Sequence, residues 1–101
     1  MLLKEEEIEN GVFVSYYDSS NVWASKYIYS EKKLAIIFSK GQQYIYDNVL
    51  PYHYQRFKVA KSQGVSLREH ILKNYSHVRV EDKLDGEMMQ QISETISKLQ
   101  K

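Results

Sequence analysis

The stretch that decides the fold is Leu-Ala-Ile-Ile-Phe-Ser-Lys-Gly-Gln-Gln-Tyr-Ile-Tyr, residues 34–46. Its first part, residues 34–39, is the most apolar run in the chain, which is typical of a central strand. Gly41 suits a tight turn because glycine adopts positive φ without a steric penalty. The second part returns with Tyr44 and Tyr46 on one face, since successive side chains of a strand alternate. The stretch therefore predicts an antiparallel hairpin whose second strand carries tyrosines.

Further extended segments lie on both sides of this hairpin. Residues 12–17 are β-branched and aromatic, and residues 22–29 resume an extended pattern after a polar turn. Residues 76–84 alternate loosely and supply a candidate edge strand. We therefore expect a small antiparallel β-sheet of three to five strands.

The sequence period changes after the hairpin. Pro51 suits the first turn of a helix because it has no N–H group to leave unpaired there. A first helix is expected over residues 52–62, with Gly64 as its stop. Ser66 and Glu69 form the pattern of a capping box, which predicts that a second helix begins at this point. We expect these two short helices to pack on one face of the sheet.

The two ends of the chain differ in character. The acidic cluster Glu5-Glu6-Glu7-Glu9 is interpreted as a solvent-exposed terminal helix and not as a paired-carboxylate site. Asp85 is expected to cap a last helix over residues 86–100. The apolar residues of that helix recur at helical spacing and are Met89, Ile92, Ile96 and Leu99. This seam either packs on the domain or pairs two copies in a homodimer. The fold class is thus α+β, with residues 1–101 as a single domain and an added C-terminal helix.

The composition excludes several classes of chemistry. The chain has 101 residues and no cysteine, so disulfides, a thiol nucleophile and a Cys-ligated metal are excluded, and a reducing compartment is favoured. His53, His70 and His77 lack the spacing of a metal site. No nucleophile elbow, phosphate-binding glycine loop or dinucleotide fingerprint occurs. No apolar run is long enough to cross a membrane, and the N-terminus is too acidic for a signal peptide. We therefore expect a cytoplasmic protein that is not an enzyme and has no catalytic residue, cofactor, metal or membrane partner.

Small polar residues, aromatic residues and glycines recur in the order of a known module. They are Ser19-Ser20-Asn21, Tyr27, Leu34, Phe38, Gly41, Tyr44, Tyr46, Val49, Pro51, Tyr54, Phe57, Ala60, Ser62, Gly64, Ile71 and Tyr75. Over residues 19–75 the chain resembles the KTSC domain, a short module found as a stand-alone bacterial and phage protein and at the C-terminus of some lysyl-tRNA synthetases. The resemblance implies a core over 19–75, with residues 1–18 and 76–101 as extensions. Because the domain also occurs as part of a tRNA synthetase, the resemblance implies RNA binding by association.

The chain departs from the pattern of this family at two places. Leu50 separates Val49 from Pro51, which are adjacent in the family and set how the helix is entered. Leu67-Arg68 replaces an aromatic residue followed by Asn after Gly64. The second departure changes a side chain that is a candidate for function in the family.

Charge and tyrosine content point to a binding module. Residues 22–80 carry ten basic and three acidic residues, whereas residues 1–21 carry one basic and five acidic residues. The chain has nine tyrosines, seven of them in the basic region, and this combination suits a single-stranded nucleic acid, because bases stack on rings while cations meet phosphates. The alternative is that Tyr44, Tyr54 and Tyr75 are core residues whose hydroxyls reach the rim, and Tyr27 and Tyr46 are the better candidates for exposure. The candidate ligand-contacting residues are Tyr27, Lys40, Tyr46, Arg56, Lys58, Lys61 and Arg68.

Two interpretations of function stay open. The first is a non-catalytic binding module for RNA or another nucleotide or polyanion. The second is a protein-interaction or inhibitory module that uses its terminal extensions, such as a phage protein acting on a host factor or an oligomer that sequesters a nucleotide signal. The turn Ser19-Ser20-Asn21 likewise has two interpretations, since it either only closes the turn or also holds a phosphate through its backbone N–H groups.

Overall fold

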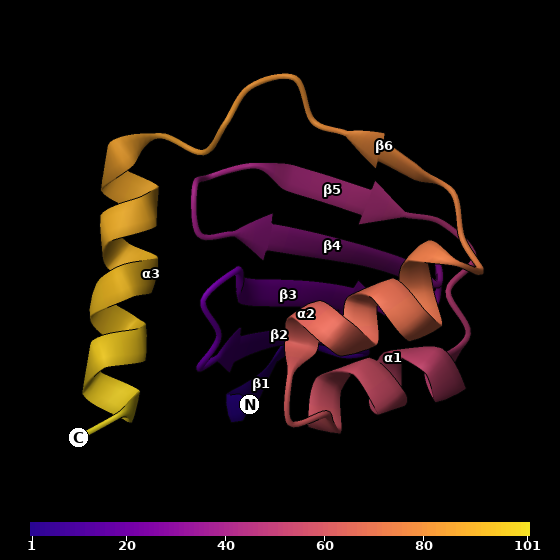
Figure 1. Ribbon diagram of the computed structural model, residues 1–101, viewed down its shortest axis with the longest axis horizontal. Coiled ribbons are helices and arrows are strands. Elements are labelled where there is room, and N and C mark those ends of the chain that lie inside the picture. Colours follow the sequence, from indigo (N-terminus) through magenta and orange to yellow (C-terminus); the bar gives the residue numbers. More distant parts are fainter.

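One antiparallel sheet of six strands forms the centre of the molecule in a computed structural model of residues 1–101 (Figure 1). Its strands lie in the order of the sequence, from β1 at one edge to β6 at the other. The elements are β1 (Leu2–Glu9), β2 (Val12–Tyr17), β3 (Val22–Ile28), β4 (Lys33–Phe38), β5 (Gln43–Tyr46), α1 (Pro51–Val59), α2 (Gln63–Ser66), the π-helix η1 (Leu67–Leu72), β6 (His77–Arg79) and α3 (Gly86–Leu99). The predicted α+β class is confirmed.

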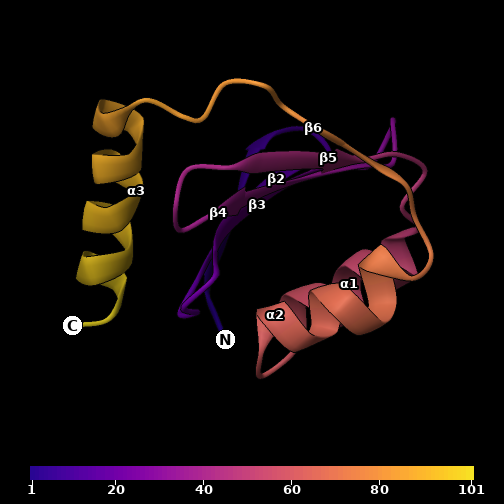
Figure 2. The ribbon, with the colours of Figure 1, turned by 45° about the horizontal axis from the view of Figure 1, so that its top comes forward.

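One side of the curved sheet is covered by α1, α2 and η1, whereas α3 stands beside one end of the strands (Figure 1). Figure 2 shows α1 and the continuous helix formed by α2 and η1 together on that side, away from α3. The core lies on the side of α1, where Tyr17, Tyr27 and Tyr46 of the sheet are fully buried. Phe57 of α1 and Ile71 of η1 complete this core. The predicted packing of two short helices on one face is confirmed.

The hairpin of residues 34–46 forms as its sequence predicts. Leu34 pairs with Tyr46 and Ile36 pairs with Tyr44, so these four side chains face the helices. Gly41 has a φ of +91°, the left-handed region that glycine adopts without strain. The alternation of strand side chains thus carries both tyrosines of β5 toward the helices.

The sheet exceeds the expected three to five strands because the acidic N-terminal segment is a strand. The prediction of a terminal helix is wrong: β1 pairs with β2, with Glu5 opposite Ser15 and Glu6 opposite Val14. This pairing satisfies the backbone groups of β2, and carboxylates on an edge strand discourage the addition of another chain. The candidate edge strand in 76–84 is confirmed as the three residues of β6.

The boundary between the two core helices differs from the prediction. The helix α1 ends at Val59, and Gly64 lies inside α2 and does not terminate α1. Ser62 caps the second helix, because its Oγ accepts a hydrogen bond of 3.3 Å from the N–H of Val65. The predicted capping box is wrong, since Ser66 is buried within the helix and its hydroxyl has no partner.

The C-terminal helix begins where the sequence predicts. The carboxylate of Asp85 accepts a hydrogen bond of 2.8 Å from the N–H of Met88. The seam of Met89, Ile92, Ile96 and Leu99 is half-buried, and α3 contacts β3 and β1 of the same chain. Two interpretations of this seam were predicted, and the structure of the single chain shows the one in which the seam packs on the domain. No helix combines the length and the apolar composition that a membrane span requires.

Candidate ligand-binding groove

A groove of about 470 Å³ lies between the β4–β5 hairpin and the helix formed by α2 and η1. The turn before β3 and the start of β3 contribute Asn21 and Val22 to its lining. The hairpin contributes Phe38, Ser39, Lys40, Gln42, Tyr44 and Tyr46, and the helix contributes Gly64, Leu67, Arg68 and Leu72. None of these residues is acidic, so the groove carries a net positive charge from Lys40 and Arg68.

The hairpin side of the groove is held by backbone hydrogen bonds. The N–H of Phe38 donates to the carbonyl of Gln42 at 2.9 Å, and the N–H of Gly41 donates to the carbonyl of Phe38 at 2.9 Å. The N–H of Ser39 donates to the carbonyl of Asn21 at 2.8 Å and ties the hairpin to the turn before β3. Lys40 therefore projects from a fixed turn, although its own side chain is exposed.

The helical side of the groove is a π-helix. Leu67 is buried and Arg68 beside it is exposed, so one residue anchors η1 on the core while the next reaches solvent. π-helical turns are rare and occur frequently at functional sites. The place where the chain departs from the family pattern, Leu67-Arg68, is thus part of the lining of the groove.

The polar side chains of the groove have no partners within the protein. Asn21, Lys40, Gln42 and Arg68 form no side-chain hydrogen bond and no ion pair with the rest of the chain. Tyr46 is fully buried, and its hydroxyl has no hydrogen-bond partner. Burial raises the pKa of Tyr46 to about 12, so the hydroxyl stays protonated and can donate at neutral pH. The groove therefore presents two cations and two amides without partners in the chain, and the hydroxyl of Tyr46, a residue of its lining, is buried and unpaired.

Aromatic side chains form the outer part of the hairpin wall. The rings of Phe38 and Tyr44 meet edge to face at 5.2 Å, and His77 of β6 stacks on Tyr44 at 4.6 Å. Arg79 of β6 lies opposite Tyr44 in the strand register. Sequence reasoning assigned Tyr44 to the core and did not select Phe38 or Gln42 as site residues. The spacing of two residues between Tyr44 and Tyr46 was the signal in the sequence that both side chains lie on the same face of β5.

Three of the seven predicted ligand-contacting residues come together in the groove. Lys40 of the hairpin and Arg68 of the helix are both part of its lining. Tyr46 also belongs to the lining, but the expectation that it is exposed is wrong because its ring is fully buried. Asn21 joins them, while Ser19 closes the preceding turn by accepting a hydrogen bond of 3.2 Å from the N–H of Val22.

Tyr27 is a core residue, and its predicted exposure is wrong. It is fully buried, its ring stacks on Tyr54 at 4.3 Å, and its hydroxyl donates to the carbonyl of Val49. Burial raises its pKa to about 12. The hydroxyl thus serves to attach the segment before α1 to the sheet.

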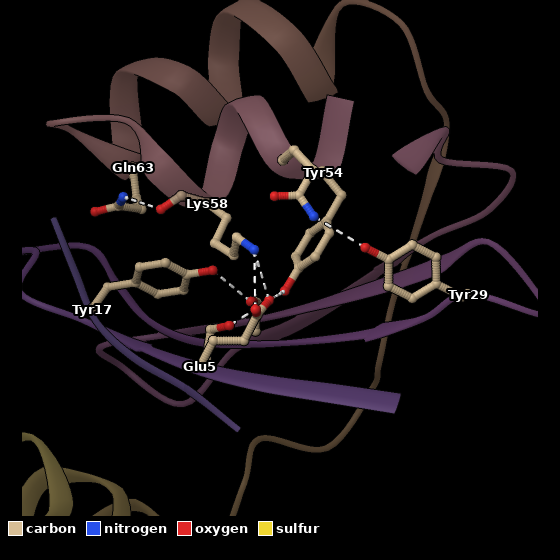
Figure 3. A network of polar contacts seen from close by, with 9 residues as sticks. Glu5, Tyr17, Tyr29, Tyr54, Lys58 and Gln63 are labelled. Carbon is tan, nitrogen blue, oxygen red and sulfur yellow. Dashed lines mark hydrogen bonds and ion pairs between the residues drawn. The ribbon is translucent and has the colours of Figure 1, made fainter. Parts of the chain in front are cut away.

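Lys58, also predicted as a ligand contact, is buried in an ion pair outside the groove. Figure 3 shows its ammonium group directed at the carboxylate of Glu5, where both oxygens lie 3.0 Å from Nζ. The hydroxyl of Tyr54 donates to the same carboxylate at 2.7 Å and lies 3.3 Å from Oγ of Ser15. We call Glu5, Ser15, Tyr54 and Lys58 the Glu5 cluster. It joins β1 and β2 to α1, and Lys58 is only 8% exposed within it.

The remaining two predicted residues lie outside the groove. Arg56 of α1 is exposed, and its guanidinium donates to the hydroxyl of Tyr52 at 2.7 and 3.0 Å. Lys61 is exposed in the connection between α1 and α2. No group of three or more His, Asp or Glu side chains is arranged to hold a metal ion.

The comparisons with known proteins identify the part of the chain that builds the groove. No curated protein matches the sequence. The family model of the KTSC domain matches residues 18–75. Every residue that lines the groove falls within this match, whereas β1 and α3 lie outside it. Since the match spans more than half of the chain, the protein belongs to the KTSC domain family.

Proposed function

We propose that the protein is a non-catalytic binding module for a nucleotide-type ligand, either RNA or a free nucleotide, and that the groove is its binding site. The observation that carries this proposal is the pair Lys40 and Arg68, which face one groove without an acidic neighbour in its lining. Unpaired cations on two sides of a concave site favour an anion such as a phosphate. As its location we propose a reducing compartment such as the cytoplasm, which the lack of cysteine favours.

The buried hydroxyl of Tyr46 supports the same proposal. A buried polar group without a partner costs about 1–3 kcal/mol relative to a satisfied one. Native proteins keep few such groups, and each has a reason such as a bound water, ion or ligand. An acceptor atom on the ligand would supply the partner that the fold does not provide.

The burial of Tyr27 and Tyr46 limits the kind of surface that the ligand meets. A broad stacking platform for single-stranded RNA needs exposed rings, and these two tyrosines are in the core. The proposal therefore rests on the groove and not on the tyrosine content of the whole sheet. Aromatic contact with the ligand falls to Phe38 and Tyr44, which are half-buried in the groove wall.

Charge reversal tests the proposal. In fluorescence-anisotropy titrations with a labelled single-stranded RNA and a labelled nucleotide, Arg68→Glu and Lys40→Glu should each weaken binding by about 100-fold, because a like charge replaces a charge-assisted hydrogen bond. Lys61→Glu is the matched control, since Lys61 is an exposed cation outside the groove lining, and it should change affinity less than about threefold.

Circular dichroism should show that all three variants keep the wild-type melting temperature. The proposal fails if neither probe binds the wild-type protein at low salt. It also fails if Lys61→Glu removes binding as strongly as Arg68→Glu does.

The alternative function, a protein-interaction or inhibitory module, rests on the C-terminal helix. The helix α3 is amphipathic, yet none of its residues is fully buried, and Met88 is 47% exposed. Pairing with a second copy of the chain or with another protein would bury this apolar face. The other protein would be a host factor, and further copies of the chain would form an oligomer that sequesters a nucleotide. Light scattering of the full chain tests whether it forms a homodimer. A concentration of 100 µM is about a hundred times the Kd of a micromolar dimer, so a monomer at that concentration would rule the homodimer out.

A further inference from the structure

The size of the groove bears on which nucleotide-type ligand it takes. Its volume of about 470 Å³ falls in the lower half of the usual range for small-molecule sites, roughly 300–1,000 Å³. A site for single-stranded nucleic acid is instead an extended basic channel that follows about four or more nucleotides. The volume of this groove is therefore that of a compact ligand.

The surrounding charges do not extend the groove along α1. Arg56 donates to the hydroxyl of Tyr52 and lies outside the lining, and Lys58 is buried against Glu5. Lys26 alternates with the core residue Tyr27 on β3 and therefore lies on the opposite face of the sheet. Only Lys40 and Arg68 supply positive charge to the lining, which matches a ligand with one phosphate group.

The rest of the lining divides into apolar walls and neutral polar groups. The lining includes Phe38 and Tyr44 from the hairpin and Leu67 and Leu72 from the helix, and these four provide the apolar surface that a planar base requires. Asn21 and Gln42 add unpartnered amides, which pair with base edges through donor and acceptor atoms. The hydroxyl of Tyr46 adds a donor that stays neutral.

We infer that the groove selects a single free mononucleotide, with its phosphate between Lys40 and Arg68 and its base between the apolar walls, and excludes an RNA strand. This inference rests on the proposed function and narrows it. In this arrangement the phosphate is held by the two cations of the lining, and an acceptor atom of the ligand takes the hydrogen bond from Tyr46.

Isothermal titration calorimetry of the full chain tests this inference with four separate 5′-mononucleotides, inorganic phosphate and a 12-nucleotide single-stranded RNA. At least one mononucleotide should bind at one molecule per chain, and at least about tenfold more tightly than inorganic phosphate because the base adds its own contacts. Raising the salt from 50 to 200 mM should change this affinity by less than about fivefold, because a mononucleotide has no condensed counterions to release.

Tyr46→Phe tests the predicted role of the hydroxyl. The substitution should weaken the binding of the mononucleotide by about tenfold, because one hydrogen bond is lost, without lowering the melting temperature. Lys61→Glu should leave the mononucleotide affinity unchanged.

The outcomes separate this inference from the proposed function. If the RNA binds with steep salt dependence, Arg68→Glu removes that binding and no mononucleotide binds, the inference is overturned while the proposed function stands. If neither RNA nor any mononucleotide binds at low salt, both fail. If inorganic phosphate binds as tightly as every mononucleotide, the base has no site in the groove and the inference is overturned.

Discussion

The Glu5 cluster and the groove lie on the same face of the sheet and contain similar side chains. They differ in whether their polar groups have partners within the chain. In the Glu5 cluster, a buried tyrosine and a buried lysine both meet a carboxylate within 3.0 Å. In the groove, a buried tyrosine and two cations meet no partner in the chain. Burying a polar group is costly unless it is hydrogen-bonded. The first site therefore contributes to stability, whereas the polar groups of the second have no partner in the chain, which is why we propose it as the ligand site.

The largest effect should come from breaking the ion pair of the Glu5 cluster. Lys58→Ala leaves the carboxylate of Glu5 under α1 without its cation, and Glu5 is only partly shielded from water, so we expect a loss of about 2–3 kcal/mol of unfolding free energy. Urea denaturation followed by circular dichroism measures this loss. Arg68→Ala, the matched cation of the groove, should cost less than about 0.5 kcal/mol because it pairs with nothing. Equal losses for the two variants would remove the distinction between the two sites.

A smaller effect should separate the two tyrosine hydroxyls. Tyr54→Phe removes a donor to Glu5 and should cost about 1–2 kcal/mol, because the carboxylate loses a hydrogen bond. Tyr46→Phe removes a hydroxyl that has no partner, so the unfolding free energy should stay within about 0.5 kcal/mol of wild type or rise. The midpoint of urea unfolding reports both values. A Tyr46→Phe variant that loses as much as Tyr54→Phe would show that the hydroxyl has a structural partner.

The smallest effect should come from the hairpin turn that carries Lys40. Gly41→Ala places a side chain at φ +91° and near the backbone of Leu84, so we expect a loss of about 1 kcal/mol. Gly86→Ala is the matched control, because a Cβ there meets nothing within 4 Å at the start of α3. That variant should be neutral or slightly stabilising, since alanine favours the helix. Thermal melts of both variants check the difference, and a Gly86→Ala variant less stable than Gly41→Ala would contradict it.

The fold was predictable wherever the evidence is local in sequence. The hairpin of residues 34–46 follows from an apolar run, a glycine turn and strand alternation. The cap at Asp85 follows from the side-chain chemistry of one residue. The acidic segment was wrongly predicted to be a helix. It forms a strand because it pairs with β2, and its composition alone shows only a high charge. Ser62 and Ser66 are both good capping residues, and packing of η1 on the core selected Ser62.

The candidate site was predictable only in part. Lys40 and Arg68 were identifiable as basic residues next to a turn and near a helix start, and the structure places both in one groove. Lys58 has the same chemistry in the sequence but is paired with Glu5, which lies 53 residues away. Tyr27 was expected at the surface because tyrosine serves both as a core residue and as an exposed stacking surface. Its full burial follows from the position of Tyr54 above it.

The order of the amino acids is enough to derive the α+β class, the central hairpin, the helical segments and the membership of the family over residues 18–75. Periodicity, turn chemistry and capping act over a few residues and can be read directly along the chain. Only the tertiary structure decided which tyrosines are buried and which cations keep no partner. Those properties depend on which distant segment covers each side chain, because burial and ion pairing are set by contacts across the fold.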